Sequence, residues 1–224
     1  MDQMKRFAVY YAPEPGGFAD AAAAWLGWDP VAGRAVAQPL PGLAGRTAEP
    51  ARYGFHGTIK PPFRLAAGFG LADLHRGLHD LAASLPGVDM PGLDLVQIDG
   101  FMALVPQGDP VALRDLAARV VAGLEPFRAP LNDAEIARRR PERLTPRQRQ
   151  LLDQFGYPYV MEEFQFHLTL TDRIPEAEAA PLRALALAHF GPHLPRPFRL
   201  TQLCLFGEAQ TGAFHLLHRY PLAR

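Results

Sequence analysis

The sequence predicts an α+β protein with antiparallel sheets, helices on one face of each sheet, and two lobes that meet at a cleft. Strand-like and helix-like segments follow one another in the order strand, helix, two strands, and this order occurs twice. Of the 224 residues, 48% are hydrophobic and 21% are charged, and this composition excludes global disorder. A chain of this length is long enough to form a hydrophobic core. The 20 glycines and 23 prolines divide the chain into short elements.

The first half, about residues 1–125, is expected to open with a strand over Arg6–Tyr11 that Pro13 ends. An Ala-rich helix over 18–28 follows, with Trp25 and Leu26 as packing residues. Residues 29–50 are rich in Gly and Pro and are interpreted as an exposed loop, with a lid as the alternative. The pattern then predicts a strand around Phe55–Ile59 that stops at Pro61-Pro62, a helix near 71–85, strands over 93–98 and 101–105, and a helix over 110–125.

Residues 126–156 differ in composition, with seven arginines against three acidic residues between positions 128 and 149. Thr145-Pro146 has the form of a helix N-cap followed by proline at the first helical position, and Gly156 is placed to end that helix. The segment is therefore predicted to be a helical insertion. The arginines at 138–143 face either an anionic substrate or solvent, and an exposed helix is the favoured interpretation.

The second half, about residues 157–224, repeats the element order. It has a predicted strand over Glu163–Thr171, a helix over 176–190, and a hairpin-like pair at Phe198–Phe206 and Phe214–Tyr220. The repetition lies in element order and not in sequence identity, and it indicates a coarse internal duplication.

Charge and cysteine content exclude several classes of protein. Basic and acidic residues number 23 each and the pI is near 7.1, so coating of long double-stranded nucleic acid is disfavoured, while a local basic patch stays open. The single cysteine, Cys204, forms no internal disulfide and excludes thiolate zinc sites. No apolar run reaches the roughly 20 residues of a membrane span, and the apolar stretch over 7–12 is too short for a signal peptide. The expectation is a cytoplasmic protein without a membrane partner.

Two short strings carry the chemical signal: Phe55-His56-Gly57-Thr58-Ile59-Lys60 and Phe166-His167-Leu168-Thr169-Leu170-Thr171. In each, histidine and threonine stand two residues apart in a strand-like segment, so their side chains share one face. One such string is most often a solvated sheet face. Two copies, each preceded by phenylalanine and each in one half of a repeated pattern, favour one shared site.

These strings resemble the paired His-x-Thr-x signatures of the 2H phosphoesterase superfamily, which includes 2′-5′ RNA ligase-like proteins and cyclic phosphodiesterases. The longer strings Tyr53–Phe63 and Gly156–Thr171 look like the branch associated with phosphonate-metabolism genes. The resemblance extends over essentially the whole chain, including the arginine-rich insertion. It implies a bilobal fold with pseudo-twofold symmetry, in which two antiparallel sheets line a central groove and helices cover the outer faces.

By the match of motif residues, the resemblance implies that His56 and His167 are catalytic and that Thr58 and Thr169 bind phosphate. Hydrolysis of a cyclic phosphodiester needs a base for water and an acid for the departing oxygen, and two imidazoles with a pKa near 6.5 supply both at neutral pH. They must lie on opposite sides of phosphorus, because the attacking and leaving oxygens are roughly in line. A threonine hydroxyl donates to a nonbridging oxygen.

Four further residues are candidate substrate contacts. Lys60 shares the predicted face of His56, and Gln165 and Thr171 share the predicted face of His167. Tyr10 is the groove candidate of the first strand, because the alternation places Tyr11 on the opposite face with the core residues.

No metal or cofactor is predicted. His75 and His79 stand at the i, i+4 spacing that binds zinc, but no glutamate follows His75 and a surface helix is the favoured interpretation. Structural or surface roles are the default for the remaining histidines, which are His189, His193, His215 and His218.

The predicted function is a metal-independent phosphoesterase that opens a cyclic phosphate or cleaves a small phosphodiester, with a phosphorylated metabolite or nucleotide as substrate. Three alternatives stay open: a noncatalytic module that binds nucleotides or RNA ends, a 2′-5′ RNA ligase-type activity in the same groove, and a metal-dependent hydrolase. The sequence leaves the exact substrate, the acid and base roles of the two histidines, and the oligomeric state undecided.

Overall fold

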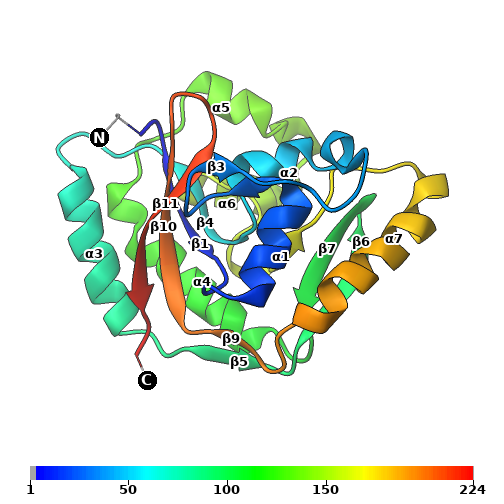
Figure 1. Ribbon diagram of the computed structural model, residues 1–224. Helices are drawn as coiled ribbons and strands as arrows, with labels where there is room; N and C mark the ends of the chain where they lie inside the picture. Colours follow the sequence, from blue (N-terminus) through cyan, green and yellow to red (C-terminus); the bar gives the residue numbers. More distant parts are fainter. Residues whose placement is uncertain (1–3, 224) are drawn as a thin grey trace.

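The computed structural model describes residues 4–223, and at its centre is a seven-stranded sheet with the strand order β11-β10-β1-β4-β8-β7-β6 (Figure 1). Each neighbouring pair in this sheet is antiparallel. The strands are β1 (Phe7–Tyr11), β4 (Gly57–Phe63), β6 (Leu93–Ile98), β7 (Phe101–Pro106), β8 (Leu168–Thr169), β10 (Gln202–Glu208) and β11 (Phe214–Pro221). The prediction of an α+β protein with antiparallel strands is confirmed.

The strands that were expected to form two separate sheets are joined into this one sheet. The junction is narrow, since β4 and β8 pair only at Gly57 and Leu168. The C-terminal strands β10 and β11 pair beside the N-terminal strand β1, so the two sequence halves do not correspond to two halves of the sheet. The element order could not reveal this, because it says nothing of which distant strands pair.

Two small sheets accompany the large one, and they pair β2 (Trp28–Asp29) with β3 (Arg34–Ala35) and β5 (Val88–Met90) with β9 (Phe198–Leu200). The segment predicted as one strand over Phe198–Phe206 is therefore divided between β9 and β10.

The helices are α1 (Gly17–Leu26), α2 (Ala48–Tyr53), α3 (Leu71–Ala83), α4 (Val111–Gly123), α5 (Asp133–Arg138), α6 (Pro146–Phe155) and α7 (Glu176–Phe190). Short 3₁₀ helices lie at Leu43–Arg46, Glu125–Phe127, Pro141–Arg143, Met161–Glu163 and Gly191–His193. The segment 29–50, predicted to be a loop, therefore contains two short strands, a 3₁₀ helix and the start of α2.

Helix α6 begins and ends as the sequence predicts. The Thr145 hydroxyl accepts a hydrogen bond from the Gln148 backbone N–H, and Pro146 occupies the first helical position. Gly156 ends the helix in the left-handed conformation, with φ of 73°.

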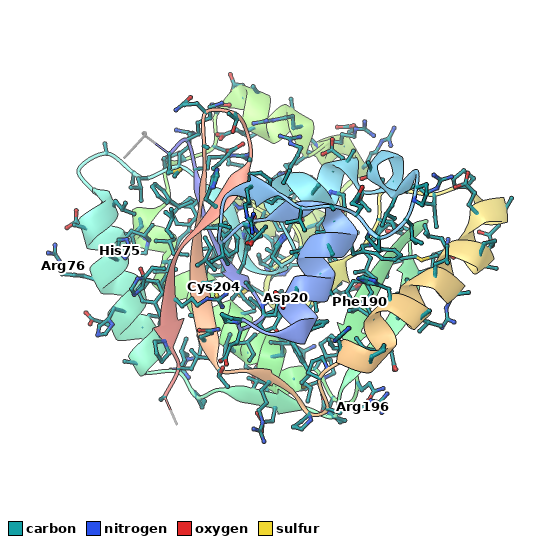
Figure 2. All side chains as sticks on the ribbon, viewed as in Figure 1. Asp20, His75, Arg76, Phe190, Arg196 and Cys204 are labelled. Carbon is teal, nitrogen blue, oxygen red and sulfur yellow. The ribbon has the colours of Figure 1, made fainter. Side chains whose placement is uncertain are left out.

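One face of the sheet packs against the helices in a continuous core. Phe7, Val9 and Tyr11 of β1 belong to it, together with apolar residues of α1, α3, α4 and α7. Trp25 of α1 is fully buried there, and its indole N–H donates to the Leu170 carbonyl at 2.9 Å. Figure 2 shows Phe190 at the end of α7 close to α1, and its ring lies 5.5 Å from that of Trp25. The helices therefore cover this face and leave the other for the site.

The opposite face carries the alternate residues of the same strands. Ala8 and Tyr10 of β1 form a smaller cluster there with Phe206 and Phe214, and Tyr53 packs against it. The predicted alternation of Tyr10 and Tyr11 between the two faces is thus confirmed.

Candidate active site

The two histidines come together because β4 and β8 are neighbours in the sheet. His56 directly precedes β4 and His167 directly precedes β8. Gly57 is paired with Leu168, so continuing this antiparallel register by one residue places His56 across from Thr169 and Thr58 across from His167. All four side chains then leave the sheet on the face opposite Leu168, which is in the core. Each histidine therefore faces the threonine of the other motif.

Both imidazoles make the same local contact. The Nδ1 atom of His56 lies 2.8 Å from the Gly54 carbonyl oxygen, and that of His167 lies 2.9 Å from the Gln165 carbonyl oxygen. A carbonyl oxygen only accepts, so Nδ1 carries the proton in each ring. The Nε2 atom of the neutral ring is then left as the proton acceptor. Two rings with this shared tautomer can exchange protons with a substrate through their Nε2 atoms.

The surroundings of the two rings differ. The ring centroid of His56 lies 4.0 Å from that of Tyr10 and 5.8 Å from that of Tyr53. Burial lowers the pKa of His56 to about 4, with a further lowering from His167 and an opposing effect of the Gly54 carbonyl. The ring centroid of His167 lies 5.7 Å from that of Phe101. His56 is therefore neutral at neutral pH, which suits a general base.

Two adjoining cavities form the groove over these residues. The His56 cavity, of about 650 Å³, is lined by His56, Thr58 and Thr169 among others. The His167 cavity, of about 420 Å³, is lined by Thr58, His167 and Gln165 among others. Thr58, Pro61, Phe101 and Tyr157 border both cavities. The two histidines therefore line two adjoining cavities that share part of their walls, and each cavity has the size that small molecules occupy.

Three of the four further candidates border this groove. Tyr10 is buried and lines the His56 cavity beside the His56 ring. Gln165 lines the His167 cavity, and its carbonyl group holds the His167 ring. Thr171 borders the His56 cavity but is 1% exposed, and its hydroxyl accepts from the Met102 N–H at 2.9 Å. That hydroxyl ties the chain after β8 to β7.

Lys60 does not line either groove cavity. Its ammonium group donates to the Val121 carbonyl and to Glu125, both at 3.1 Å, and the side chain is 1% exposed. The expected shared face with His56 fails because the β1–β4 pairing contains a register shift: Tyr10 is opposite Thr58, but Val9 is opposite Lys60. The extra residue, Ile59, interrupts the alternation of faces, so Lys60 turns toward α4 and not toward the groove.

Sequence reasoning missed much of the groove wall. Five aromatic residues and several charged residues line it, namely Tyr53, Phe101, Tyr157, Arg6, Arg139, Arg173, Glu49 and Asp172 in the His56 cavity and Tyr159, Phe164, Asp99 and Glu163 in the His167 cavity. Tyr53 and Tyr157 belong to the extended strings around the two motifs, which is the only signal that pointed to them. Arg139 belongs to the arginine cluster for which an exposed helix was favoured. It is half-buried and lines the groove.

The remaining histidines lie outside this groove. His75 on α3 faces β11, where it hydrogen-bonds the Tyr220 hydroxyl, and Figure 2 shows it on that helix. His189 is held by the Ala21 carbonyl at 2.8 Å, in agreement with a structural role. Within residues 4–223, no group of three or more histidine, cysteine or acidic side chains is arranged to hold a metal ion. No helix in the same range is long and apolar enough to cross a membrane.

Fold and site define an α+β protein whose central sheet presents two histidine–threonine pairs to one groove. The sequence pattern of the family described as Protein of unknown function (DUF1045) matches residues 58–215, and the chain belongs to this family.

Two curated relatives carry the name Ribose 1,5-bisphosphate phosphokinase PhnN. The protein of Janthinobacterium sp. (strain Marseille) is 34% identical over 223 residues, covering 95% of this chain and 49% of its own length. That of Laribacter hongkongensis (strain HLHK9) is 36% identical over 220 residues, covering 96% of this chain and 51% of its own length. The chain thus spans about half the length of these relatives. A crystal structure of E. coli LigT complexed with 3′-AMP is similar over 99% of this chain and 100% of that chain, with 18% identity and a TM-score of 0.46.

Proposed function

We propose that this protein is a metal-independent phosphoesterase that opens a cyclic phosphate, or cleaves a small phosphodiester, by acid–base catalysis between His56 and His167. The observation that carries the proposal is the antiparallel register at Gly57 and Leu168, which brings the two histidine–threonine pairs to one groove. The matching Nδ1 contacts leave an Nε2 atom on each ring for proton transfer.

In the proposed reaction, neutral His56 accepts a proton from water as the water oxygen attacks phosphorus. The bond from phosphorus to the ester oxygen on the opposite side breaks, and protonated His167 gives its proton to that oxygen. The water oxygen forms the new P–O bond. His56 gains one proton and His167 loses one, so the reaction needs no reactant other than the phosphoester and water. The Thr58 and Thr169 hydroxyls donate to the nonbridging oxygens, whose charge is greatest in the transition state.

The relatives support a phosphorylated ribose as the class of substrate. Their name describes a kinase of ribose 1,5-bisphosphate, and the name PhnN agrees with the resemblance to the phosphonate-associated branch. We therefore place the reaction beside phosphonate metabolism. The kinase activity itself is not part of the proposal: a P-loop needs lysine directly after glycine, whereas Lys5 and Lys60, the two lysines of this sequence, follow Met4 and Ile59.

The test is a substrate screen of 2′,3′-cyclic nucleotides and ribose 1,2-cyclic phosphates, with the position of the product phosphate read by phosphorus NMR. In His56→Ala and His167→Ala variants, turnover is expected to fall by roughly 10²- to 10⁴-fold while ligand affinity stays measurable. Binding without turnover by the wild-type protein would instead support the noncatalytic nucleotide- or RNA-end-binding module. Joining of RNA ends would support the ligase alternative.

A further inference from the structure

Arg139, the residue that follows α5, has a guanidinium group without an acidic partner. Its central carbon lies 4.7 Å from the centroid of the Tyr157 ring, so the ring face holds the cation in place. No carboxylate of residues 4–223 lies within 4.0 Å of this guanidinium group. None of its N–H groups donates a hydrogen bond to an acceptor among these residues. By contrast, Arg6 of the same cavity is paired with Glu208 at 2.5 Å. The Tyr157 ring therefore holds the Arg139 side chain in place, while no acidic side chain of residues 4–223 pairs with its positive charge.

The place of Arg139 connects it to the proposed reaction. Arg139 and Tyr157 line the same 650 Å³ cavity as His56, Thr58 and Thr169. That cavity is much larger than one phosphate group, and Thr58 and Thr169 already serve the reacting phosphate in the proposed function. The donors of Arg139 are thus available to another part of the same ligand.

The charges of the groove differ between its two ends. The His56 cavity contains Arg139 and Arg173 in addition to the paired Arg6. Of its two acidic residues, Glu49 is paired with Arg52 and Asp172 accepts from the backbone N–H groups of Ala48 and Glu49. The His167 cavity is lined by Asp99 and Glu163 and by no arginine. An anionic substituent of the ligand is therefore attracted to the His56 end.

We propose that Arg139, held against Tyr157, binds a second, non-reacting phosphomonoester of the substrate at the His56 end of the groove. A planar guanidinium group makes two parallel hydrogen bonds to a phosphate, which fixes the orientation of the ligand as well as adding affinity. The proposal rests on the proposed function, in which the reacting phosphate lies between His56 and His167. It makes the substrate a bisphosphorylated compound with one cyclic and one terminal phosphate.

The binding test uses two ligands that are not hydrolysed, adenosine 3′-monophosphate and adenosine 3′,5′-bisphosphate, measured by calorimetry at one fixed ionic strength. The wild-type protein is expected to bind the bisphosphate roughly 10- to 100-fold more tightly, the contribution of charge-assisted hydrogen bonds. Arg139→Ala removes most of this preference, and Arg139→Lys restores part of it because the charge stays but the fork geometry is lost.

The matched control is Arg143→Ala. Arg143 belongs to the same insertion, is exposed, and lines neither cavity, so its removal changes the net charge equally. Equal affinity of the wild-type protein for the two ligands would overturn the proposal. So would an equal loss of preference in the Arg139 and Arg143 variants, or an Arg139→Ala protein that melts at a lower temperature with its preference intact.

A turnover experiment separates this inference from the proposed function. Adenosine 2′,3′-cyclic phosphate is compared with its 5′-phosphorylated form, and the 5′-phosphate is expected to raise kcat/KM in the wild-type protein but not in Arg139→Ala. Binding preference without hydrolysis of either compound would end the phosphoesterase proposal and leave the phosphate subsite standing. Hydrolysis of both compounds at equal kcat/KM would support the phosphoesterase proposal and overturn the phosphate subsite.

Discussion

His56 and His167 make the same backbone contact, yet their rings meet different surroundings. Tyr10 and Tyr53 enclose His56, whereas His167 has Phe101 beside it. Desolvation favours the neutral form of an imidazole, and burial accordingly lowers the pKa of His56 to about 4. The surroundings of His56, and not the motif, are the reason why we propose His56 as the base and His167 as the acid.

The first prediction at this scale concerns the pH dependence of hydrolysis. A base must be neutral, and the pKa of His56 is lowered to about 4, so protonation of the base should not lower kcat/KM as the pH falls from 7 to 5. An ordinary histidine would already be largely protonated at pH 5. Tyr10→Ala exposes the His56 ring and should move the acidic limb toward pH 6.5. A wild-type limb near pH 6.5, with the protein still folded by circular dichroism, contradicts this assignment.

Gly57 gives a second prediction, because it stands where the two motifs touch. A Cβ atom at this position would lie 2.2 Å from the Phe166 ring, so Gly57→Ala forces β4 and the His167 segment apart. We expect the free energy of unfolding to fall by about 1–3 kcal/mol and turnover to fall with it. Chemical denaturation measures the first quantity.

Two further variants make the Gly57 result specific. Adding Phe166→Ala to Gly57→Ala removes the clash and should restore part of the activity. The control is Gly45→Ala, where a Cβ atom meets nothing within 4 Å and the effect should be small. Full activity and stability of Gly57→Ala would show that the junction is not tightly packed.

At the scale of single elements, alternation along a strand correctly predicted which side chains share a face where the strand is regular. It placed Tyr10 apart from Tyr11 in β1. The strand predicted over Glu163–Thr171 is limited to Leu168–Thr169, and a 3₁₀ helix covers Met161–Glu163. Alternation failed at Lys60, because an extra residue in β4, between Thr58 opposite Tyr10 and Lys60 opposite Val9, interrupts the alternation there. Such a shift arises from pairing with β1, about fifty residues earlier in the chain, and has no signature in the local sequence.

The corrected position of Lys60 leads to a prediction about α4 and the insertion. Its ammonium group binds Glu125, which also binds Arg128 at 2.6 Å, so this network joins β4 to the start of the insertion. Lys60→Met keeps the buried volume, and Glu125 retains its second partner. We expect a loss of roughly 1–3 kcal/mol in the free energy of unfolding and little change in kcat/KM at a temperature where the variant is folded.

Lys5→Met is the matched control for that experiment. Lys5 is the other lysine of the sequence, is exposed, and binds only the Gln210 carbonyl in the interactions described for its side chain. It should leave both stability and turnover near the wild-type values. A large fall in kcat/KM for Lys60→Met at unchanged stability would return Lys60 to the phosphate site.

At the scale of the whole molecule, the longer helices and the principal strands could be predicted from the sequence, whereas the short α2, β2 and β3 and the assembly of the groove could not. Local periodicity located α3 and α7 within a few residues. The pairing of β1 with β10 and the approach of Tyr157 and Arg139 to the groove depend on contacts between segments far apart in the chain. The paired motifs nevertheless predicted which histidines and threonines line the two cavities, because each motif carries its own histidine and threonine.

The last prediction follows from how the whole sheet completes the site. If β4 and β8 together supply the base, the acid and the donors to the phosphate oxygens, the reaction needs no Lewis acid. Turnover should then survive dialysis against EDTA followed by assay in metal-free buffer, with rates within about twofold of the untreated protein. Added Zn²⁺ or Mn²⁺ should not raise them. Loss of turnover on chelation and its return with one metal ion would favour the metal-dependent hydrolase and remove the two-histidine mechanism. Unchanged turnover that still collapses in His167→Ala would leave the two imidazoles as the groups that move the protons.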